Sequence, residues 1–381
     1  MIIRNHTLTI LISFLIIILL SLLTCKSSEE ITAPRVEVGQ EFLKALPVNV
    51  EDFIYFANIG WVPGKIFPCD HGGFLLSDIT KQVPVFSPAD MTITRIMATV
   101  QGKWGYTDYA LNLSVNQEEF IVTIGHMSAL HKDIQALVDS YGEIECDTLI
   151  SFDNMYIHCL MWVDIPVAAG DTLGMAGGNP GQNGLDFGTY DKTRKIEFAT
   201  DRFEGYWYPY TVSPLDYFTD EICQILIPIC GFTLCPGEFT VRTVPPVGGT
   251  IDFDIPGTAQ GIWFKVGEPF SPVDPHMALV YHNVDPSVPI FSIGTGLPDL
   301  ERGSYTFTIA DTGYVDRPFH VVKPDSHLYQ YNVWYHCSTS PSMRAVLLLQ
   351  MIDEMHLKIE KQDVDTGPPW QFTENAVMYD R

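Results

Sequence analysis

The stretch Val167-Ala168-Ala169-Gly170-Asp171-Thr172-Leu173-Gly174-Met175-Ala176-Gly177 contains a turn followed by a short apolar run. Gly170-Asp171 is a typical turn dipeptide, and the run from Thr172 to Ala176 has the length of one strand. Runs of the same kind occur on both sides of it along the chain. The pattern predicts a protein built from short strands that are bounded by turns.

The composition leads to the same fold class. The chain has 381 residues, of which 46% are hydrophobic and 18% charged, and it contains 29 Gly and 26 Pro. These proportions exclude a disordered chain and favour short strands and turns, so we expect a mainly β protein. The 46 acidic and 22 basic residues give a formal charge of -24, which repels phosphate backbones and argues against nucleic acid as a partner.

The first 25 residues predict export. Arg4 precedes an apolar run from Leu8 to Leu23, which at about 16 residues is shorter than the roughly 20 of a membrane-spanning helix. Leu22-Leu23-Thr24-Cys25 resembles a bacterial lipobox, which implies lipidation of Cys25 and a membrane-anchored lipoprotein of the cell envelope. The alternatives are a cleaved signal peptide and an uncleaved anchor with an incidental cysteine.

After residue 25 the sequence divides into four parts. Residues 26–37 form a polar tether, 38–219 a first β domain, 220–237 a cysteine-rich connector, and 238–381 a second antiparallel β domain, either a sandwich or a barrel. Cys146 and Cys159 flank a predicted strand, so disulfides are expected in an oxidising compartment, although the pairing stays open.

The predicted elements of the first domain are a helix and seven strands. The amphipathic helix covers Ser128–Ser140, with Ser128 as its cap. The strands cover Phe53–Asn58, Val85–Ser87, Met91–Val100, Tyr109–Val115, Phe120–Gly125, Thr172–Ala176 and Lys195–Thr200. In the second domain we expect Phe239–Val244, Thr250–Phe253, Gly261–Val266, Met277–Tyr281, Ile290–Ile293, Tyr305–Ala310, His320–Val322, Leu328–Trp334, Arg344–Met351 and His356–Glu360.

An ordered series of motifs in the first domain carries the chemistry. It reads Cys69-Asp70-His71-Gly72-Gly73-Phe74-Leu75, Val85-Phe86-Ser87-Pro88-Ala89-Asp90-Met91-Thr92, Gly125-His126-Met127-Ser128, the stretch quoted first, and Gly184-Leu185-Asp186-Phe187-Gly188. In order and spacing it resembles the lysostaphin-like (LytM-like) zinc endopeptidases over about Ile66 to Glu197. The resemblance implies an antiparallel sheet of that family's kind in the first domain.

The resemblance also implies roles for single residues. His71 matches the first zinc ligand, and His126 matches the histidine that assists catalysis. Leu75 stands where the family has its ligand aspartate, and Gly184 and Asp186 stand where it has H-x-H. A catalytic zinc needs three protein donors, whereas His71 and Asp186 supply two; Asp70 and Asp78 are the candidates for a third, outside the family's spacing.

We therefore expect binding rather than cleavage. The hypothesis is a metallopeptidase-like pseudoenzyme without a cofactor, whose groove at His71, His126 and Asp186 recognises peptidoglycan or an envelope protein. The alternatives are an active zinc endopeptidase with a noncanonical ligand set, and a second domain whose aromatic residues carry a small ligand. For the three groove residues, purely structural roles in turns and loops are the competing interpretation.

Overall fold

A computed structural model describes residues 35–62, 64–140, 144–151, 154–235, 238–270, 274–338, 345–363 and 369–381. The expected signal segment, Cys25 and most of the tether therefore lie outside the described residues. Residues 38–381 form one unit, and residues 35–37, which belong to a separate N-terminal unit, carry no helix or strand.

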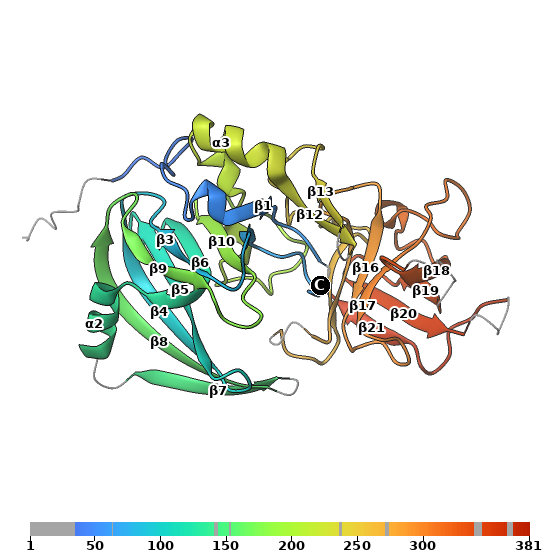
Figure 1. Cartoon of the computed structure of the whole chain (residues 1–381). Coiled ribbons are helices and arrows are strands. Elements are labelled where there is room, and N and C mark those ends of the chain that lie inside the picture. Colours follow the sequence, from blue (N-terminus) through green and yellow to red (C-terminus); the bar gives the residue numbers. More distant parts are fainter. Residues whose placement is uncertain are drawn as a thin grey trace, which may run out of the picture. The chain divides into compact units, whose positions relative to one another are not determined.

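The protein is mainly β, with one large sheet and a closed antiparallel barrel, which confirms the predicted fold class (Figure 1). The sheet runs in the order β13-β12-β1-β2-β10-β6-β5-β4-β8-β7, while β11 pairs with β10, and β9 pairs with β3 and β6. Its strands are β1 (Phe53–Ala57), β2 (Gly72–Leu76), β3 (Gln82–Phe86), β4 (Met91–Gln101), β5 (Tyr106–Val115), β6 (Phe120–Leu130), β7 (Glu145–Ser151), β8 (Asn154–Val167), β9 (Thr172–Gly177), β10 (Gly184–Asp191), β11 (Thr211–Val212), β12 (Cys230–Cys235) and β13 (Glu238–Val241).

The core of the sheet explains why β2, β10 and β6 stay together. Phe74 of β2, Leu185 and Phe187 of β10, and Val122 and Ile124 of β6 are fully buried and belong to one apolar cluster. Burying large apolar side chains is the main favourable term in folding, so these three neighbouring strands are firmly placed. The residues that alternate with the buried ones face the other side of the sheet.

The predicted helix over Ser128–Ser140 is wrong in its first turn. Strand β6 continues to Leu130, and helix α2 covers only Lys132–Ser140. Met127 and Leu130 pair with Ala176 and Gly174 of β9, so their backbone belongs to a ladder. The Ser128 hydroxyl accepts a hydrogen bond from the Gln82 side chain and caps no helix.

Lys195–Thr200 is not a strand, because its backbone finds single, scattered partners. The amide of Ile196 donates to the carbonyl of Pro209, and the amide of Ala199 donates to Asp254. Lys195 and Glu197 form an exposed ion pair instead of one face of a sheet. The alternation of charged and apolar residues was therefore a misleading signal for a strand.

The segment expected as a connector contains regular structure. Helix α3 covers Asp220–Leu226, and β12 then pairs in parallel with β1 and antiparallel with β13. Cys223 and Cys230 are free thiols. The side chain of Cys235 lies outside the described part of the chain.

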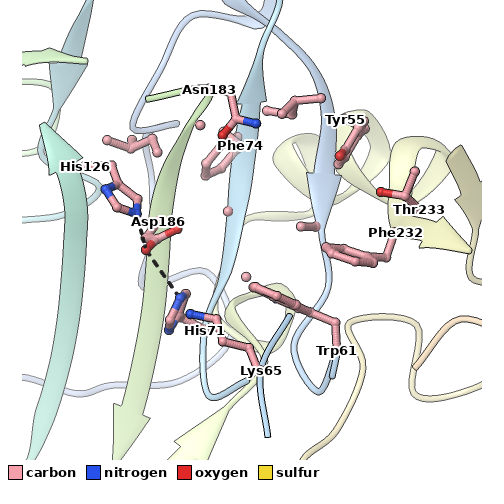
Figure 2. Close-up of a pocket in the computed structure, with 16 residues that line it drawn as sticks. Tyr55, Trp61, Lys65, His71, Phe74, His126, Asn183, Asp186, Phe232 and Thr233 are labelled. Atoms are coloured by element: carbon pink, nitrogen blue, oxygen red, sulfur yellow. Dashed lines mark ion pairs between the residues drawn. The ribbon is translucent and has the colours of Figure 1, made fainter. Parts of the chain in front are cut away.

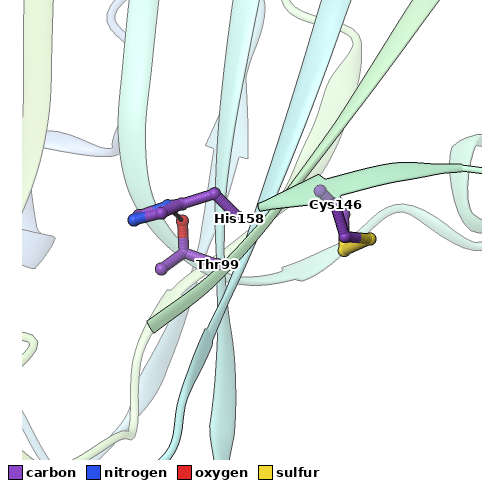
Figure 3. Close-up of a disulfide and its surroundings, with 4 residues drawn as sticks. Thr99, Cys146 and His158 are labelled. Atoms are coloured by element: carbon purple, nitrogen blue, oxygen red, sulfur yellow. Dashed lines mark hydrogen bonds between the residues drawn. A yellow bond between two sulfur atoms is a disulfide. The ribbon is translucent and has the colours of Figure 1, made fainter. Parts of the chain in front are cut away.

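A disulfide between Cys146 and Cys159 joins β7 to β8, where the two residues lie directly opposite each other. Figure 3 shows this bridge together with the contact between Thr99 of β4 and His158 of β8. Cys337 is also disulfide-bonded. No helix among the described residues has the length and apolar composition needed to cross a membrane.

The barrel has strands β14 (Gly261–Lys265), β15 (Met277–Tyr281), β16 (Pro289–Ile293), β17 (Gly303–Thr306), β18 (Tyr329–Tyr335), β19 (Ala345–Met351), β20 (His356–Gln362) and β21 (Val377–Asp380), each paired with the next and β21 with β14. Its interior is filled by buried side chains that include Trp263, Phe291, Phe307 and Tyr331. The rings of Phe307 and Tyr331 lie 4.8 Å apart. These aromatic residues therefore form a packed core.

Two predicted strands of the second domain are absent. Thr250–Phe253 is irregular, and Phe319–Val321 forms a 3-10 helix where His320–Val322 was expected as a strand. Phe319 is fully buried against Phe291 of the barrel core, at 4.8 Å between ring centroids. A short apolar run was thus buried without joining the sheet.

Candidate functional site

Glycines on both sides of Asp186 open the space around its side chain. Asp186 lies in β10, where its cross-strand neighbours are Gly73 of β2 and Gly125 of β6. Neither neighbour has a side chain, so the carboxylate is accessible from both adjacent strands. His71 and His126 stand close to these glycines along the chain and reach Asp186 from opposite sides (Figure 2).

His126 reaches the carboxylate through an irregularity of β6. Between the pairs Tyr109–Met127 and Leu111–Ile124, two residues of β6 face the single residue Ala110 of β5, which is a β-bulge. His126 has a positive φ of 62°, a left-handed conformation that costs on the order of 1 kcal/mol for a residue other than glycine. The bulge turns the imidazole toward β10.

A glycine also makes room for His71. A Cβ atom at Gly188 would lie 2.6 Å from Thr123 Oγ1, 3.1 Å from the Tyr190 hydroxyl and 3.2 Å from His71 Cβ. Only a residue without a side chain fits there. Gly188 thus allows the His71 imidazole to lie over β10.

The three side chains form one ion-paired set, which we call the His-Asp-His cluster (His71, Asp186 and His126). Asp186 Oδ2 lies 3.3 Å from His71 Nε2 and 3.2 Å from His126 Nε2. The cluster is partly open to solvent, since the side chains of His126 and Asp186 are 48% and 39% exposed and that of His71 is 21% exposed. The sequence prediction that these three residues converge agrees with this geometry.

Each imidazole contacts Asp186 through Nε2 and a second carboxylate through Nδ1. His71 Nδ1 lies 2.9 Å from Asp70 Oδ1, and His126 Nδ1 lies 2.8 Å from Asp108 Oδ2. Gln182 donates a hydrogen bond to the other oxygen of Asp108 at 3.0 Å. The Tyr190 hydroxyl likewise donates to Asp70. Both rings are therefore fixed in orientation before any ligand binds.

These contacts favour the charged form of every member. Burial lowers the pKa of His71, but the neighbouring Cys69 and the hydrogen bonds to Asp186 and Asp70 raise it well above its usual value. The hydrogen bond to Asp108, helped by the charge of Asp186, raises the pKa of His126 to about 9 against the opposing effect of burial. Burial raises the pKa of Asp186, but His71 and the charges of His126 and Lys65 bring it down to about 2.

The cluster borders a cavity of about 330 Å³. Aromatic rings line its other side, where Trp61 and Phe232 stack at 4.9 Å between centroids and Tyr55 lies nearby. Lys65, Asn183 and Thr233 supply further polar groups. Figure 2 shows the charged side chains toward one side of this groove and Trp61, Phe232 and Tyr55 toward the other.

The residues present do not fit the zinc site that the resemblance implies. Leu75, at the position of the ligand aspartate, lines the groove with an apolar side chain. Asp70 is engaged by His71 and Tyr190, and Asp78 pairs with Lys81 and Thr80 away from the groove lining. Asp70 contacts Nδ1 of His71, whereas Asp186 faces Nε2 of the same ring, and Asp78 does not line the groove, so neither carboxylate meets Asp186 at one nitrogen of His71.

Cys69, Asp70 and His71 form the one group among the described residues whose possible ligand atoms all lie within 4.8 Å of one another. Cys69 Sγ lies 3.5 Å from His71 Nδ1 and 3.3 Å from Nε2. Such similar distances place the sulfur over the ring and not along the in-plane lone pair of either nitrogen. The group is therefore not arranged to bind one metal ion through Cys69 and His71 together.

The sequence did not indicate the partners of the cluster. Asp108 and Gln182 behind His126, and Trp61, Lys65 and Phe232 along the groove, belong to none of the motifs. The one available signal was Asp108, an acidic residue inside the run of strand-forming residues that became β5.

Comparison with known proteins leaves the motif resemblance without independent support. No protein-family model matches the chain. No curated protein and no solved structure is significantly similar to it.

Proposed function

We propose that the groove beside the His-Asp-His cluster binds a peptide-bearing component of the bacterial cell envelope, peptidoglycan in the first place, without cleaving it. The observation that carries this proposal is the pairing of Asp186 Oδ2 with both imidazoles, each of which is held by a further carboxylate. The groups that a hydrolase would need for catalysis are engaged with one another. Because these contacts fix the orientation of the side chains, the cluster suits a site that binds a ligand without reacting with it.

The protonation state of the histidines favours binding over catalysis. A general base must offer a free lone pair near neutral pH, and a zinc ligand must be a neutral imidazole. Asp108 raises the pKa of His126 to about 9, and, against the effect of burial, Cys69, Asp186 and Asp70 raise that of His71 well above its usual value, so the contacts of both rings favour the protonated form. Protonated rings stabilise negative charge and are poor general bases.

The rest of the groove matches a peptide ligand. Trp61, Phe232 and Tyr55 offer apolar faces, while Asn183 and Thr233 offer groups that hydrogen-bond to amides. An exported lipoprotein anchored through Cys25, as the sequence predicts, would meet peptidoglycan at the membrane surface. We therefore keep the envelope location and the lipid anchor as part of the proposal.

The test uses the full chain in detergent and soluble muropeptides prepared from peptidoglycan. Isothermal titration calorimetry is expected to show binding, and mass spectrometry to show that the muropeptides stay intact. Trp61→Leu is expected to weaken binding, whereas Lys44→Met, an exposed residue outside the groove lining, leaves it unchanged. Absence of binding would refute the peptidoglycan proposal, and recovery of an envelope protein in pull-downs would then point to that partner. Cleavage of the muropeptides would show an enzyme.

A further inference from the structure

Lys65 is an exposed cation of the groove whose ammonium no carboxylate contacts among the described residues. The two imidazoles contact Asp70, Asp108 and Asp186, whereas Lys65 acts on Asp186 only through its charge, which helps to lower the pKa of that carboxyl. No ion pair of the Lys65 ammonium occurs within the described part of the chain, and its nitrogen lies 5.1 Å from the ring centroid of Trp61. In a chain with a formal charge of -24, a groove ammonium that makes no ion pair among the described residues can bind an anionic ligand group.

Asp186 offers a matching acceptor. Its Oδ2 atom contacts both imidazoles, whereas no hydrogen bond among the described residues uses its Oδ1 atom. The side chain is 39% exposed and lines the same cavity as Lys65. An N–H donor of a ligand can therefore bind Asp186 while an anionic group of the same ligand binds Lys65.

We propose that the groove recognises the C-terminal end of a peptide, with the free carboxylate on Lys65, the adjacent amide N–H on Asp186, and the preceding side chain against Trp61 and Phe232. This inference rests on the proposed function and names the part of the peptide-bearing ligand that is bound. A peptide C-terminus is the group that presents a carboxylate, an N–H donor and an apolar side chain within one residue of each other.

A phosphate fits the same groove less well. Its second negative charge would lie near the Asp186 carboxylate, and it carries no N–H donor for Oδ1. A carboxylate with a single charge reduces this repulsion. The aromatic stack of Trp61 on Phe232 also favours a ligand with an apolar body over an inorganic anion.

The test compares two probes on the full chain, namely muropeptides with a free C-terminal carboxylate and the same muropeptides amidated at that carboxylate. We expect the amide to bind about tenfold or more weakly, since hydrogen bonds to charged groups contribute at this level. Lys65→Met should weaken binding of the acid to the level of the amide, whereas Lys65→Arg should retain most of the difference. Lys44→Met, a lysine outside the groove, is the matched control.

Each outcome separates this inference from the function on which it rests. Equal binding of acid and amide would overturn recognition of the carboxylate and leave the binding function standing. If acid and amide still bind with different affinities in Lys65→Met, Lys65 does not bind the carboxylate, and its proposed role is overturned. Binding of neither probe would refute both proposals, and inhibition by inorganic phosphate at concentrations similar to the acid would replace the peptide C-terminus by a general anion site.

Discussion

Asp108 Oδ2 lies 2.8 Å from His126 Nδ1 and holds the imidazole at the edge of the groove. Asp108 itself is nearly buried, with 11% of its side chain exposed, and Gln182 donates to its other oxygen. A buried carboxylate that is hydrogen-bonded on both oxygens orients the ring toward Asp186 and stabilises its protonated form. The relationship makes Asp108 the residue on which the charge of His126 chiefly depends.

Asp108→Asn is expected to lower the pKa of His126 from about 9 toward its usual value of 6.5, because the largest cause of the shift is removed. An NMR titration of the imidazole carbon and proton signals measures this change. Asp139→Asn, which alters a carboxylate bonded to Gln135 on α2, should leave the His126 titration where it was. An unchanged His126 pKa in Asp108→Asn would show that another group sustains its charge.

The positive charge of His126 should make the folded protein less stable as the pH rises. Because its pKa rises from 6.5 to about 9 on folding, its stabilising contribution is complete below pH 6.5 and is lost as the pH rises through about 9. The groups facing the ring are Asp108, Asp186 and His71. In urea unfolding, the difference between the wild type and His126→Gln should shrink over this range, and a constant difference would contradict the assignment.

Gly188→Ala should displace His71 and weaken ligand binding. The new methyl group would meet Thr123, Tyr190 and His71 at 3.2 Å or less, and overpacking of this kind costs about 1–3 kcal/mol. Urea unfolding gives the loss of stability, and calorimetry with muropeptides gives the loss of affinity. Gly39→Ala is the matched control, since nothing lies within 4 Å of its added methyl group. Equal effects of the two substitutions would refute the steric role of Gly188.

Much of the fold followed from local patterns. The strand Met277–Tyr281 was predicted with its observed ends, because its continuous apolar run is buried on both faces of the barrel wall. Cys146 and Cys159 were recognised as disulfide candidates because they flank a predicted strand, and they are bonded, although across the hairpin of β7 and β8. Such features depend on residues that are near one another in sequence, which is why the sequence revealed them.

The missing parts depend on contacts between distant residues. Strands β2 and β10 contain Gly72, Gly73, Gly184 and Gly188, which lower strand propensity, and they form because β1 and β6 supply partners on either side. The same holds for the site. His71, His126 and Asp186 belonged to motifs, whereas Asp108 and Lys65 became site residues only through the bulge of β6 and the loop before β2.

The disulfide between Cys146 and Cys159 should stabilise the sheet edge formed by β7 and β8. It closes a loop with a sequence separation of 13, for which restriction of the unfolded chain contributes about 3 kcal/mol. The double variant Cys146→Ser with Cys159→Ser is expected to unfold at a lower urea concentration. Its free energy of unfolding should be lower than that of the wild type by about 3 kcal/mol. Cys223→Ser, which removes a free thiol, serves as the control. Unchanged stability of the double variant would show that the bridge is dispensable.

Metal analysis distinguishes the binding groove from a zinc hydrolase. The motif resemblance gives the position of Leu75 to a ligand aspartate, and Asp70 is engaged by His71 and Tyr190. The full chain, purified without chelator or affinity-column metal, should therefore contain well below about one zinc per chain. Inductively coupled plasma mass spectrometry measures this content, and binding of muropeptides should persist in EDTA. Asp78→Asn, which alters a carboxylate outside the groove lining, controls for adventitious metal. About one zinc per chain that is lost in both His71→Ala and Asp186→Ala but kept in Asp78→Asn would identify His71 and Asp186 as zinc ligands. The third donor that a catalytic zinc needs would then have to come from another residue of the groove. That result would replace the binding proposal by a zinc endopeptidase with a ligand set of its own.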